Sequence, residues 1–362
     1  MIKTVENKSD IKSFVNFVKD LYRNDEIFTL PILSSLTKEL TKEILIKKKY
    51  VGLLCIKNGK VAGRILYTIS DSKQKKKKIG YFSFFDCIND YEVAKELFDF
   101  MENYLKGKVD YVEGTFSPYD PDTRRGILVK GFEEPHTFLT SYNYPYYQEF
   151  LEKAGYGKAY DTVALRIPLE GQSGEAMKLL AERAKRNQNL RIDDLDLNNL
   201  DRDINDVHEI LKIATSEVIY QEAPSIEMIR KVVKSLKFFL EPRLIKILRE
   251  NDTNRPLGFC FLMLDYNQIF KKTKGKINII KILSGKKKIT RARGILQYLI
   301  PEYQGTGAFS LVFWNIFRTL KELGINYFEG GTIMEDNKKS IGSLMKAGGV
   351  ITKIYRLYGK EI

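Results

Sequence analysis

The residue types that most often bind metals or act as nucleophiles are scarce in this chain. Its 362 residues include three cysteines, two histidines and one tryptophan. Cys55, Cys87 and Cys260 lie in apolar, strand-like runs, so we expect buried free thiols rather than disulfides or catalytic nucleophiles. His136 and His208 are isolated in the sequence, which argues against a metal site or a histidine-based triad. No metal cofactor is expected.

Long hydrophobic runs are also missing. No stretch approaches about 18 consecutive apolar residues, so we expect no membrane span. The N-terminal residues, beginning Met1-Ile2-Lys3, lack the apolar core of a signal peptide. Hydrophobic residues make up 43% of the chain and charged residues 29%, as in globular proteins. We therefore expect a cytoplasmic protein of two domains, because 362 residues exceed the usual size of one.

The net charge of +14 is concentrated in two segments. Residues 271–293 contain ten Lys or Arg and no acid, and residues 73–78 contain five Lys and no acid. Without these fifteen residues the chain has 45 basic and 46 acidic residues, so the remainder is almost neutral. Each segment is either a solvated charged loop or a docking patch for an acidic partner. A carrier protein, a tRNA or an anionic lipid surface would suit the 271–293 segment.

The order of predicted helices and strands occurs twice along the chain. In each half, a short strand, two helices and two strands precede an apolar strand, an amphipathic helix and another strand. Both lysine-rich segments fall between the third and fourth strands of their half. This coincidence favours a duplication, with one mixed α/β unit at residues 1–170 and another at residues 171–362. The oligomeric state does not follow from the sequence.

The most informative run is Leu299-Ile300-Pro301-Glu302-Tyr303-Gln304-Gly305-Thr306-Gly307-Ala308. A strand ends, a turn with two glycines follows, and an apolar helix begins at once. Such a turn directs several backbone N–H groups at the point where a helix dipole starts, which suits a phosphate. An ordinary strand–turn–helix crossover is the alternative. The equivalent stretch of the first half, Asp86 to Glu92, has three acids and no glycine, so we expect it to repel a diphosphate.

This order of elements resembles the second half of an acetyltransferase of the GNAT superfamily. Gln304 to Gly307 are similar to the Gln/Arg-x-x-Gly-x-Gly/Ala turn that holds the coenzyme A diphosphate in that family. Asn337 to Ser340 are similar to the Asn-x-x-Ala/Ser helix that follows its fifth strand. Two positions differ: Phe309 replaces the usual Gly or Ala, and Leu344 stands where many members have a tyrosine acid.

The resemblance extends over nearly the whole chain. Small families of bacterial tandem GNAT-like proteins have an Asn-x-Pro-Tyr-Tyr segment similar to the one that starts at Asn143. The fold class implied is α/β (an α+β mixed sheet) with two tandem GNAT-like, acyl-CoA N-acyltransferase units. The first unit is expected to be degenerate and to carry an aromatic loop at residues 117–147.

The resemblance implies an N-acyltransferase whose second unit moves an acyl group from acyl-CoA to an amine. Acetyl is the expected acyl group, and a small molecule or a peptide is the expected acceptor. The residues implied in contact with the donor are Leu299, Ile300, Gln304, Gly305, Thr306, Gly307, Ala308, Phe309, Ser310, Asn337 and Ser340. Two alternatives stay open. One is a transferase of the same fold that uses aminoacyl-tRNA, as the Fem-type enzymes do, or an acyl carrier protein. The other is a non-catalytic ligand-binding protein.

An amine acceptor must lose a proton during acyl transfer, and acidic side chains are candidate bases. Glu335 follows the predicted fifth strand of the second unit, and Glu222 lies in a loop before residue 225. Tyr298, in the fourth strand, is a candidate acid for the leaving thiolate. These assignments use residue type and position alone.

The loop at 117–147 is rich in tyrosine and proline, which favours an ordered segment. Loops of this length in compact domains are usually functional or disordered. If the loop overhangs the cleft of the second unit, then Tyr142, Asn143, Tyr146 and Tyr147 contact the acceptor, together with Glu222. The alternative is a packed aromatic lid that only completes the core of the first unit.

Overall fold

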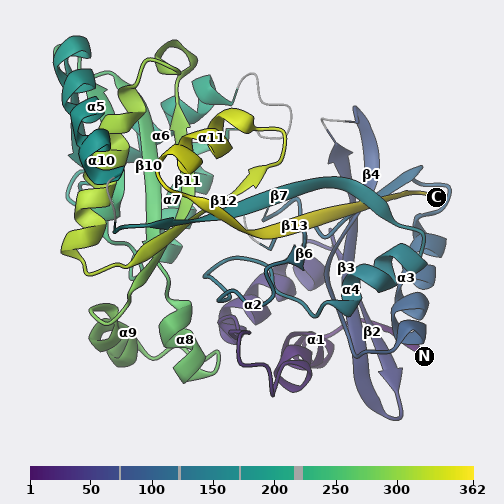
Figure 1. Ribbon diagram of the computed structural model, residues 1–362. Helices are drawn as coiled ribbons and strands as arrows, with labels where there is room; N and C mark the ends of the chain where they lie inside the picture. The colour runs from purple at the N-terminus through teal and green to yellow at the C-terminus, as the bar shows by residue number, and fades with distance from the viewer. Residues whose placement is uncertain (73–74, 121–123, 171–172, 216–222) are drawn as a thin grey trace.

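The computed structural model describes residues 1–72, 75–120, 124–170, 173–215 and 223–362 (Figure 1). Within these residues, thirteen strands form one continuous mixed sheet in the order β1-β2-β3-β4-β5-β13-β7-β12-β11-β10-β9-β8, with β6 paired to β13. This sheet, with its helices, is the mixed α/β architecture expected from the sequence.

The strands have these bounds: β1 (Ile2–Thr4), β2 (Val51–Lys57), β3 (Lys60–Ser72), β4 (Lys77–Cys87), β5 (Tyr111–Gly114), β6 (Ile127–Lys130), β7 (Gly157–Pro168), β8 (Leu190–Asp194), β9 (Ile245–Glu250), β10 (Pro256–Leu264), β11 (Arg291–Leu299), β12 (Tyr327–Met334) and β13 (Val350–Glu361). The helices have these bounds: α1 (Lys8–Leu21), α2 (Leu33–Leu40), α3 (Tyr91–Leu105), α4 (Tyr146–Lys153), α5 (Ser173–Gln188), α6 (Leu200–Ala214), α7 (Ile226–Leu236), α8 (Asn267–Thr273), α9 (Ile279–Lys286), α10 (Ala308–Glu322) and α11 (Lys338–Lys346).

The sheet of the first half buries both of its faces. Along β2, Leu53 and Cys55 belong to the cluster under α3 and α4, whereas Leu54 belongs to the cluster under α1 and α2. Successive side chains of a strand point to opposite faces, so a continuous apolar run is what a strand covered on both sides requires. The helices α1 and α2 therefore cover one face, and α3 and α4 cover the other (Figure 1).

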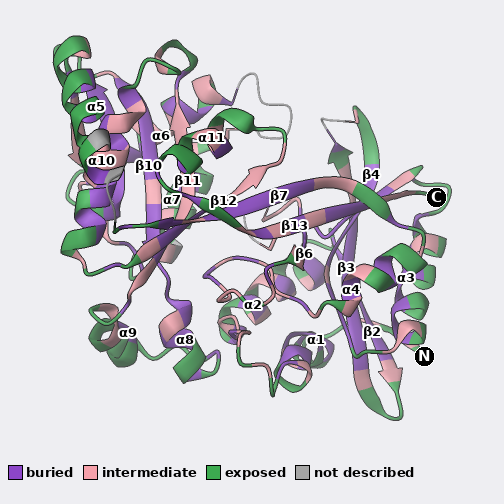
Figure 2. Ribbon diagram, in the orientation of Figure 1, coloured by how far each residue is buried: buried purple, intermediate pink, exposed green. Residues whose placement is uncertain are grey.

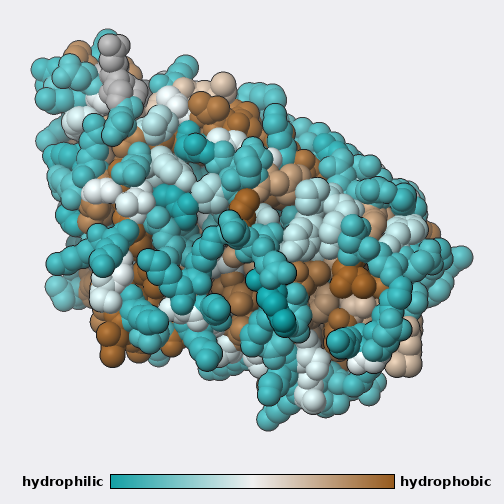
Figure 3. Space-filling view, turned by 60° about the horizontal axis from the view of Figure 1, so that its bottom comes forward, coloured by the Kyte–Doolittle hydropathy of each residue, from teal (hydrophilic) through white to brown (hydrophobic). Residues whose placement is uncertain are grey.

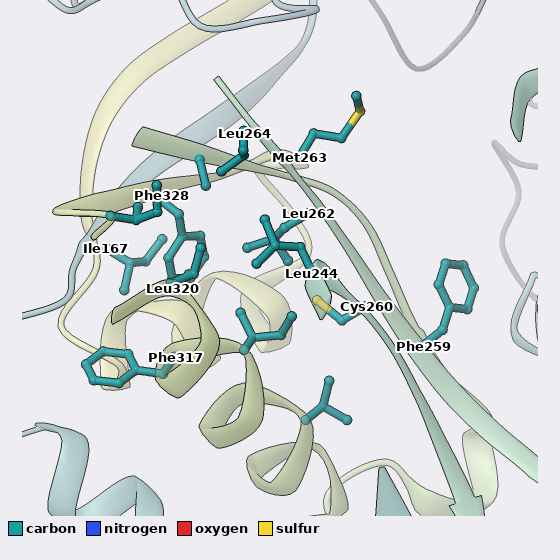
Figure 4. Close-up of a cluster of buried hydrophobic side chains, with 14 of the residues drawn as sticks. Ile167, Leu244, Phe259, Cys260, Leu262, Met263, Leu264, Phe317, Leu320 and Phe328 are labelled. Carbon is teal, nitrogen blue, oxygen red and sulfur yellow. The ribbon is translucent and has the colours of Figure 1, made fainter. Parts of the chain in front are cut away.

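The core of the second half lies between its strands and the helix α10. Phe317 and Leu320 of α10 belong to the same buried cluster as Ile167 of β7 and Phe328 of β12 (Figure 4). Burying an aliphatic or aromatic side chain contributes about 1.5–3 kcal/mol. The helix that follows the glycine turn is thus fixed to the sheet along its buried face.

The two halves exchange their last strands. The strand β7 ends the first half but pairs with β12 of the second half, through Phe328 opposite Ile167 and neighbouring residues. The strand β13 ends the chain but pairs with β5 and β6 of the first half. In Figure 1 both strands run between the two groups of helices, and Figure 2 shows the middle of β7 buried and β13 alternating between buried and intermediate residues. The boundary at residue 170 remains a prediction, since the sheet is continuous across it.

A buried polar cluster lies where the exchanged strands meet the aromatic loop. Lys353 of β13 donates from Nζ to Oε2 of Glu329 (2.6 Å), to the Pro135 carbonyl (2.7 Å) and to Oγ1 of Thr137 (3.1 Å). Lys353 is 2% exposed and Glu329 5%. Burial lowers the pKa of Lys353, but the neighbouring Tyr355 hydroxyl and Glu329 carboxylate raise it above its usual value.

The same cluster fixes the loop to the second half. Arg293 of β11 donates to the Phe138 carbonyl (2.6 Å), and the Phe138 N–H donates to Asp265 (2.9 Å). The Phe138 ring packs into the core of the second half, 5.6 Å from the ring of Phe270. The loop at 117–147 is therefore ordered where the structure describes it. It also contains the short strand β6, which the sequence analysis did not predict.

We predict that Lys353→Met destabilises the whole chain. The substitution leaves the Glu329 carboxylate buried without its cation, and breaking a buried ion pair in this way typically costs about 3–5 kcal/mol. Denaturant unfolding followed by circular dichroism measures the loss of free energy.

The matched control is Lys95→Met, which breaks an exposed pair with Asp99 and should change the free energy by about 0.5 kcal/mol or less. An equal effect of the two substitutions would show that the buried cluster does not hold the halves together.

Candidate active site

The strands β11 and β12 separate after a short parallel contact. They pair only at Arg291, Ala292 and Arg293, opposite Tyr327, Phe328 and Glu329. From Gly294 onward, β11 pairs with β10 alone. A β-bulge at Ile295, between the pairs Phe261–Leu296 and Leu262–Gly294, lies just after this point. The fourth strand of the second half thus splays away from the fifth.

The splay exposes specific backbone groups of β11. In an antiparallel pair, the N–H groups of successive residues point alternately toward and away from the partner strand. The N–H of Ile300, the residue after β11, donates to the Leu257 carbonyl of β10 (2.9 Å). The N–H of Leu299 therefore points away from β10, toward the side of β12. Because the Ile300 N–H is already bonded, Leu299 and not Ile300 can supply a donor to a ligand in the splay.

The glycine turn presents further free donors at the start of α10. Gly305 and Gly307 have φ values of 79° and 84°, in the region that favours glycine. Gly307 is the N-cap of α10 and makes no side-chain cap. Among the described residues, no hydrogen bond uses the N–H groups of Gly305, Gly307 or Phe309. A Cβ added at either glycine would meet nothing within 4 Å, so the turn is open to solvent.

The side chains of the turn serve to hold its shape. Thr306 donates from Oγ1 to the Tyr303 carbonyl (2.8 Å), and Ser310 donates to the Gly307 carbonyl (2.6 Å). Gln304 donates to the Leu299 carbonyl (3.1 Å) across the turn. Ala308 is buried, and the half-buried ring of Phe309 packs edge-on against Phe313 at 4.9 Å. Backbone N–H groups are thus the donors that this turn offers.

Asn337 and Ser340 lie at the start of α11. Asn337 is the N-cap of that helix, and its Oδ1 accepts from the Ser340 N–H (3.1 Å). Both residues follow β12, the strand on the other side of the splay. Their contact with a donor remains a prediction.

The equivalent position of the first half is closed by two tyrosines. Gly63 pairs with Cys87 as Gly258 pairs with Leu299, so Cys87 is the counterpart of Leu299. The Cys87 N–H donates to the hydroxyl of Tyr147 (3.0 Å), and the Cys87 carbonyl accepts from the hydroxyl of Tyr146 (2.8 Å). The backbone N–H that is free at Leu299 is therefore bonded at Cys87.

The helix that follows β4 is also closed to an anion. Asp90 caps α3 by accepting from the Glu92 N–H (3.1 Å). Asp86, one residue before Cys87, is buried in a pair with Arg64 and accepts from the hydroxyls of Tyr22 and Tyr147. Burial raises the pKa of Asp86, although Arg64 opposes the shift. A diphosphate at this place would meet carboxylates where the second half offers free N–H groups.

Tyr142 and Asn143 also pack against the first half. The Tyr142 hydroxyl donates to Asp25 (2.9 Å). The buried Asn143 side chain accepts from the Leu128 N–H (2.7 Å) and donates to the Leu128 carbonyl (3.1 Å) of β6. No described contact joins Tyr142, Asn143, Tyr146 or Tyr147 to the glycine turn. The positions of these four residues favour the packed aromatic lid, and their contact with an acceptor stays a prediction; Glu222 lies outside the described residues.

The two catalytic candidates lie on β11 and just after β12. Tyr298 is half-buried on β11, with its ring 5.7 Å from that of Phe259. Glu335 accepts from Lys158 Nζ (2.7 Å) and from the Asp161 N–H (3.1 Å), both on β7. The hydrogen bond from Lys158 holds the pKa of Glu335 below its usual value. This carboxylate is therefore bonded to β7, the strand that flanks β12 on the side opposite to β11.

The sequence analysis missed the buried residues at the base of the splay. Arg293 and Glu329 form the last pair of β11 with β12, and the aromatic loop bonds to both. A signal for Glu329 was present, because Tyr-x-Glu-Gly occurs at Tyr111 to Gly114 and again at Tyr327 to Gly330. Glu113 and Glu329 are each 5% exposed, so the repeated motif marks the same buried strand position in both halves.

Two further features concern metals and membranes. In the part of the chain that the structure describes, no group of three or more His, Cys, Asp or Glu side chains is placed to bind a metal ion. The three cysteines are free and buried, as expected. Within the same described ranges, no helix combines the length and the apolar character needed to cross a bilayer.

Comparison with solved structures identifies the fold. Residues along 99% of the chain superpose with a TM-score of 0.61 and 12% identity on a GCN5-related glucosamine N-acetyltransferase region of a fungal multi-domain β-N-acetylglucosaminidase, covering 38% of that chain. A tandem GNAT protein from the clavulanic acid biosynthesis pathway matches over the whole chain and 98% of its own length, with a TM-score of 0.58 and 8% identity. The chain therefore has the fold of a tandem GNAT protein.

Two relatives were found by sequence. The chain is 24% identical over 381 aligned positions to the bacterial ceramide synthase of Caulobacter vibrioides (strain NA1000 / CB15N), covering 99% of this chain and 96% of that protein. It is 28% identical over 172 residues to protein YghO of Escherichia coli (strain K12), covering 45% of this chain and 43% of that protein. The chain thus spans less than half the length of YghO in this match. No protein-family model matches the chain.

We predict that Tyr147→Phe destabilises the first half without affecting ligands of the second. The substitution leaves the buried Cys87 N–H without its acceptor, which costs about 1–3 kcal/mol. Denaturant unfolding measures this loss, with Tyr104→Phe at an exposed site as the control. A change in acyl-CoA affinity on Tyr147→Phe would instead place Tyr147 in the ligand site.

Proposed function

We propose that this protein is an N-acyltransferase that moves an acyl group from acyl-CoA to an amine in its second half. The observation that carries the proposal is the contrast between equivalent strand ends. Tyrosines bond to the backbone N–H and carbonyl of Cys87, whereas the N–H groups of Leu299, Gly305, Gly307 and Phe309 have no partner among the described residues. The GNAT fold supports acyl transfer in a general way.

The donor would lie along the free edge of β11. The N–H groups of Gly305, Gly307 and Phe309 would bind the diphosphate, because an anion at a helix N-terminus is stabilised by free amides and by the helix dipole. The pantetheine arm would follow the splay as an added strand. The Leu299 N–H would then polarise the thioester carbonyl, as a donor to the oxyanion that forms during attack.

The reaction is an attack of the amine nitrogen on the thioester carbon. A C–N bond forms, the C–S bond breaks, and the products are an amide and coenzyme A thiol. An amine of pKa near 10.4 is mostly protonated at neutral pH, and using its neutral fraction costs roughly 4–5 kcal/mol. Glu335 is our candidate base for this proton, once its hydrogen bond from Lys158 is broken. Tyr298 is the candidate acid that protonates the leaving thiolate.

A long-chain amine is the acceptor class that we favour. The relative that matches nearly the whole chain is named a bacterial ceramide synthase, and a ceramide is a long-chain amine carrying an N-acyl group. The part of β11 that does not pair with β12, and the end of β12, provide half-buried apolar side chains. These side chains would suit a long acyl chain or acceptor: Ile295, Leu296, Leu299, Ile333 and Met334.

We expect acyl-CoA to raise the melting temperature and Gly307→Trp to abolish that shift. A ligand at one hundred times its dissociation constant adds about 2.7 kcal/mol to stability. Thermal unfolding with acetyl-CoA and with a long-chain acyl-CoA measures the effect. The indole at residue 307 would block the turn.

Gly324→Trp is the matched control for Gly307→Trp. Gly324 lies at the other end of α10, has a φ of 73°, and also has nothing within 4 Å of an added Cβ. A tryptophan at either position must adopt a positive φ, so the two variants have similar backbone strain. Acyl-CoA should still stabilise Gly324→Trp. No shift with the unchanged protein, or equal shifts in both variants, would contradict the proposed donor site.

Glu335→Gln should lower kcat by about 10²–10⁴-fold if Glu335 is the base. Lys158→Met removes the hydrogen bond that lowers the pKa of Glu335, so the acid limb of the kcat/KM profile should move to higher pH. Thiol release from acyl-CoA with a long-chain amine measures both effects.

Lys153→Met, which breaks the exposed pair with Glu149, is the control and should leave the profile in place. A change of less than about twofold on Glu335→Gln would remove Glu335 from the mechanism but not the proposed donor site, since general-base catalysis contributes more than that.

A further inference from the structure

The segment around α8 and α9 presents an exposed apolar face surrounded by lysines. Ile277, Ile279, Ile280 and Leu283 are 49%, 54%, 79% and 60% exposed. These four residues, which we call the α9 face, lie within eight positions of the chain. Figure 2 shows α9 largely exposed at the edge of the second half, and Figure 3, turned to bring this side forward, shows apolar atoms beside hydrophilic ones at the lower left.

The exposure of the α9 face is fixed by packing beneath it. Ile282 and Ile289 are buried at 4% and 2%, and they attach the segment to the core. A Cβ added at Gly285 would come within 3.0 Å of Ile269, so α9 lies close against α8. Asn278 caps α9 by accepting from the Lys281 N–H (2.9 Å). The helix is therefore held with one apolar side inward and a second apolar side in solvent.

The charge around the α9 face has one sign. Residues 271–288 contain eight lysines and no acid. In the described structure, Lys286 pairs with Glu241, and Lys271 donates to the Glu26 carbonyl. The other six lysines, which are exposed and form no ion pair among the described residues, are Lys272, Lys274, Lys276, Lys281, Lys287 and Lys288. This arrangement leaves a dense positive field around exposed aliphatic groups.

We propose that the α9 face docks the protein on an anionic membrane surface. A short helix with aliphatic side chains on one side and lysines around them has the composition of interfacial helices that insert their apolar face at the headgroup level. Clusters of four to eight lysines or arginines on such a helix favour anionic lipids. Nucleic-acid surfaces instead combine basic groups with stacking aromatic residues, and the segment 271–288 contains no aromatic residue and no arginine.

This inference is independent of the proposed acyl transfer. The α9 face precedes β11, whereas the glycine turn follows it, so the two surfaces belong to opposite ends of that strand. Docking through α9 would therefore leave the glycine turn unobstructed. A failure of either proposal leaves the other in place.

The experiment is flotation of the full chain with vesicles of phosphatidylcholine alone and of phosphatidylcholine mixed with phosphatidylglycerol. The unchanged protein should float with the mixed vesicles only, and salt should weaken the binding because the lysine contribution is screened. Ile280→Ser with Leu283→Ser should lower the binding constant by at least about tenfold. Lys274→Gln, Lys276→Gln and Lys281→Gln together should lower it by about a hundredfold, because each lysine near an anionic surface adds about fivefold.

The matched control is Leu179→Ser with Leu180→Ser on α5. These leucines are 72% and 56% exposed but lie in a helix of mixed charge, so their removal should not affect flotation. All variants change exposed side chains and should keep the melting temperature of the unchanged protein. Absence of flotation with mixed vesicles would overturn the proposal. Binding of tRNA or of an acyl carrier protein through the same lysines, without flotation, would also overturn it.

Discussion

The exchange of β7 and β13 between the halves is the constraint on which the rest of the structure depends. β12 forms one side of the splay, and its outer edge is held in register by β7 of the first half. β13 in turn fills the sheet of the first half, between β5 and β7. Neither half can therefore complete its sheet alone. The buried Lys353–Glu329 pair lies at this junction, where the cost of an unpaired charge makes the correct register strongly preferred.

The same junction gives the degenerate first half a structural role in the site. Its aromatic loop bonds to Arg293 and Glu329, the last paired residues before β11 and β12 diverge. The loop thus bonds to the two strands where they begin to diverge, and the glycine turn lies at the open end of the splay. In the first half, β4 pairs with β5 only from Gly80 to Phe82, and tyrosine hydroxyls bond to the backbone of β4 beyond this point, at Cys87. The first half therefore supports the two diverging strands of the second half, and the free backbone donors lie in the second half.

Local patterns in the sequence predicted several elements of the fold. The sequence predicted an amphipathic helix after the apolar strand of the first half, where α3 lies (Tyr91–Leu105), and the two glycines with the following apolar run predicted the turn before α10. The strand exchange was not predicted, because the pairing of β13 with β5 joins residues more than 240 positions apart, and no local signal encodes it. The contacts of Tyr146 and Tyr147 were missed for the same reason, since hydroxyl partners on Cys87 depend on the tertiary fold.

The central claim is that coenzyme A binds at the glycine turn of the second half and not at its counterpart in the first half. Amide hydrogen exchange of the full chain, with and without coenzyme A, tests it most directly. The account predicts slower exchange in peptides covering residues 299–312 and no change in peptides covering residues 86–92. Unchanged exchange at 299–312, or equal protection of both turns, would contradict it.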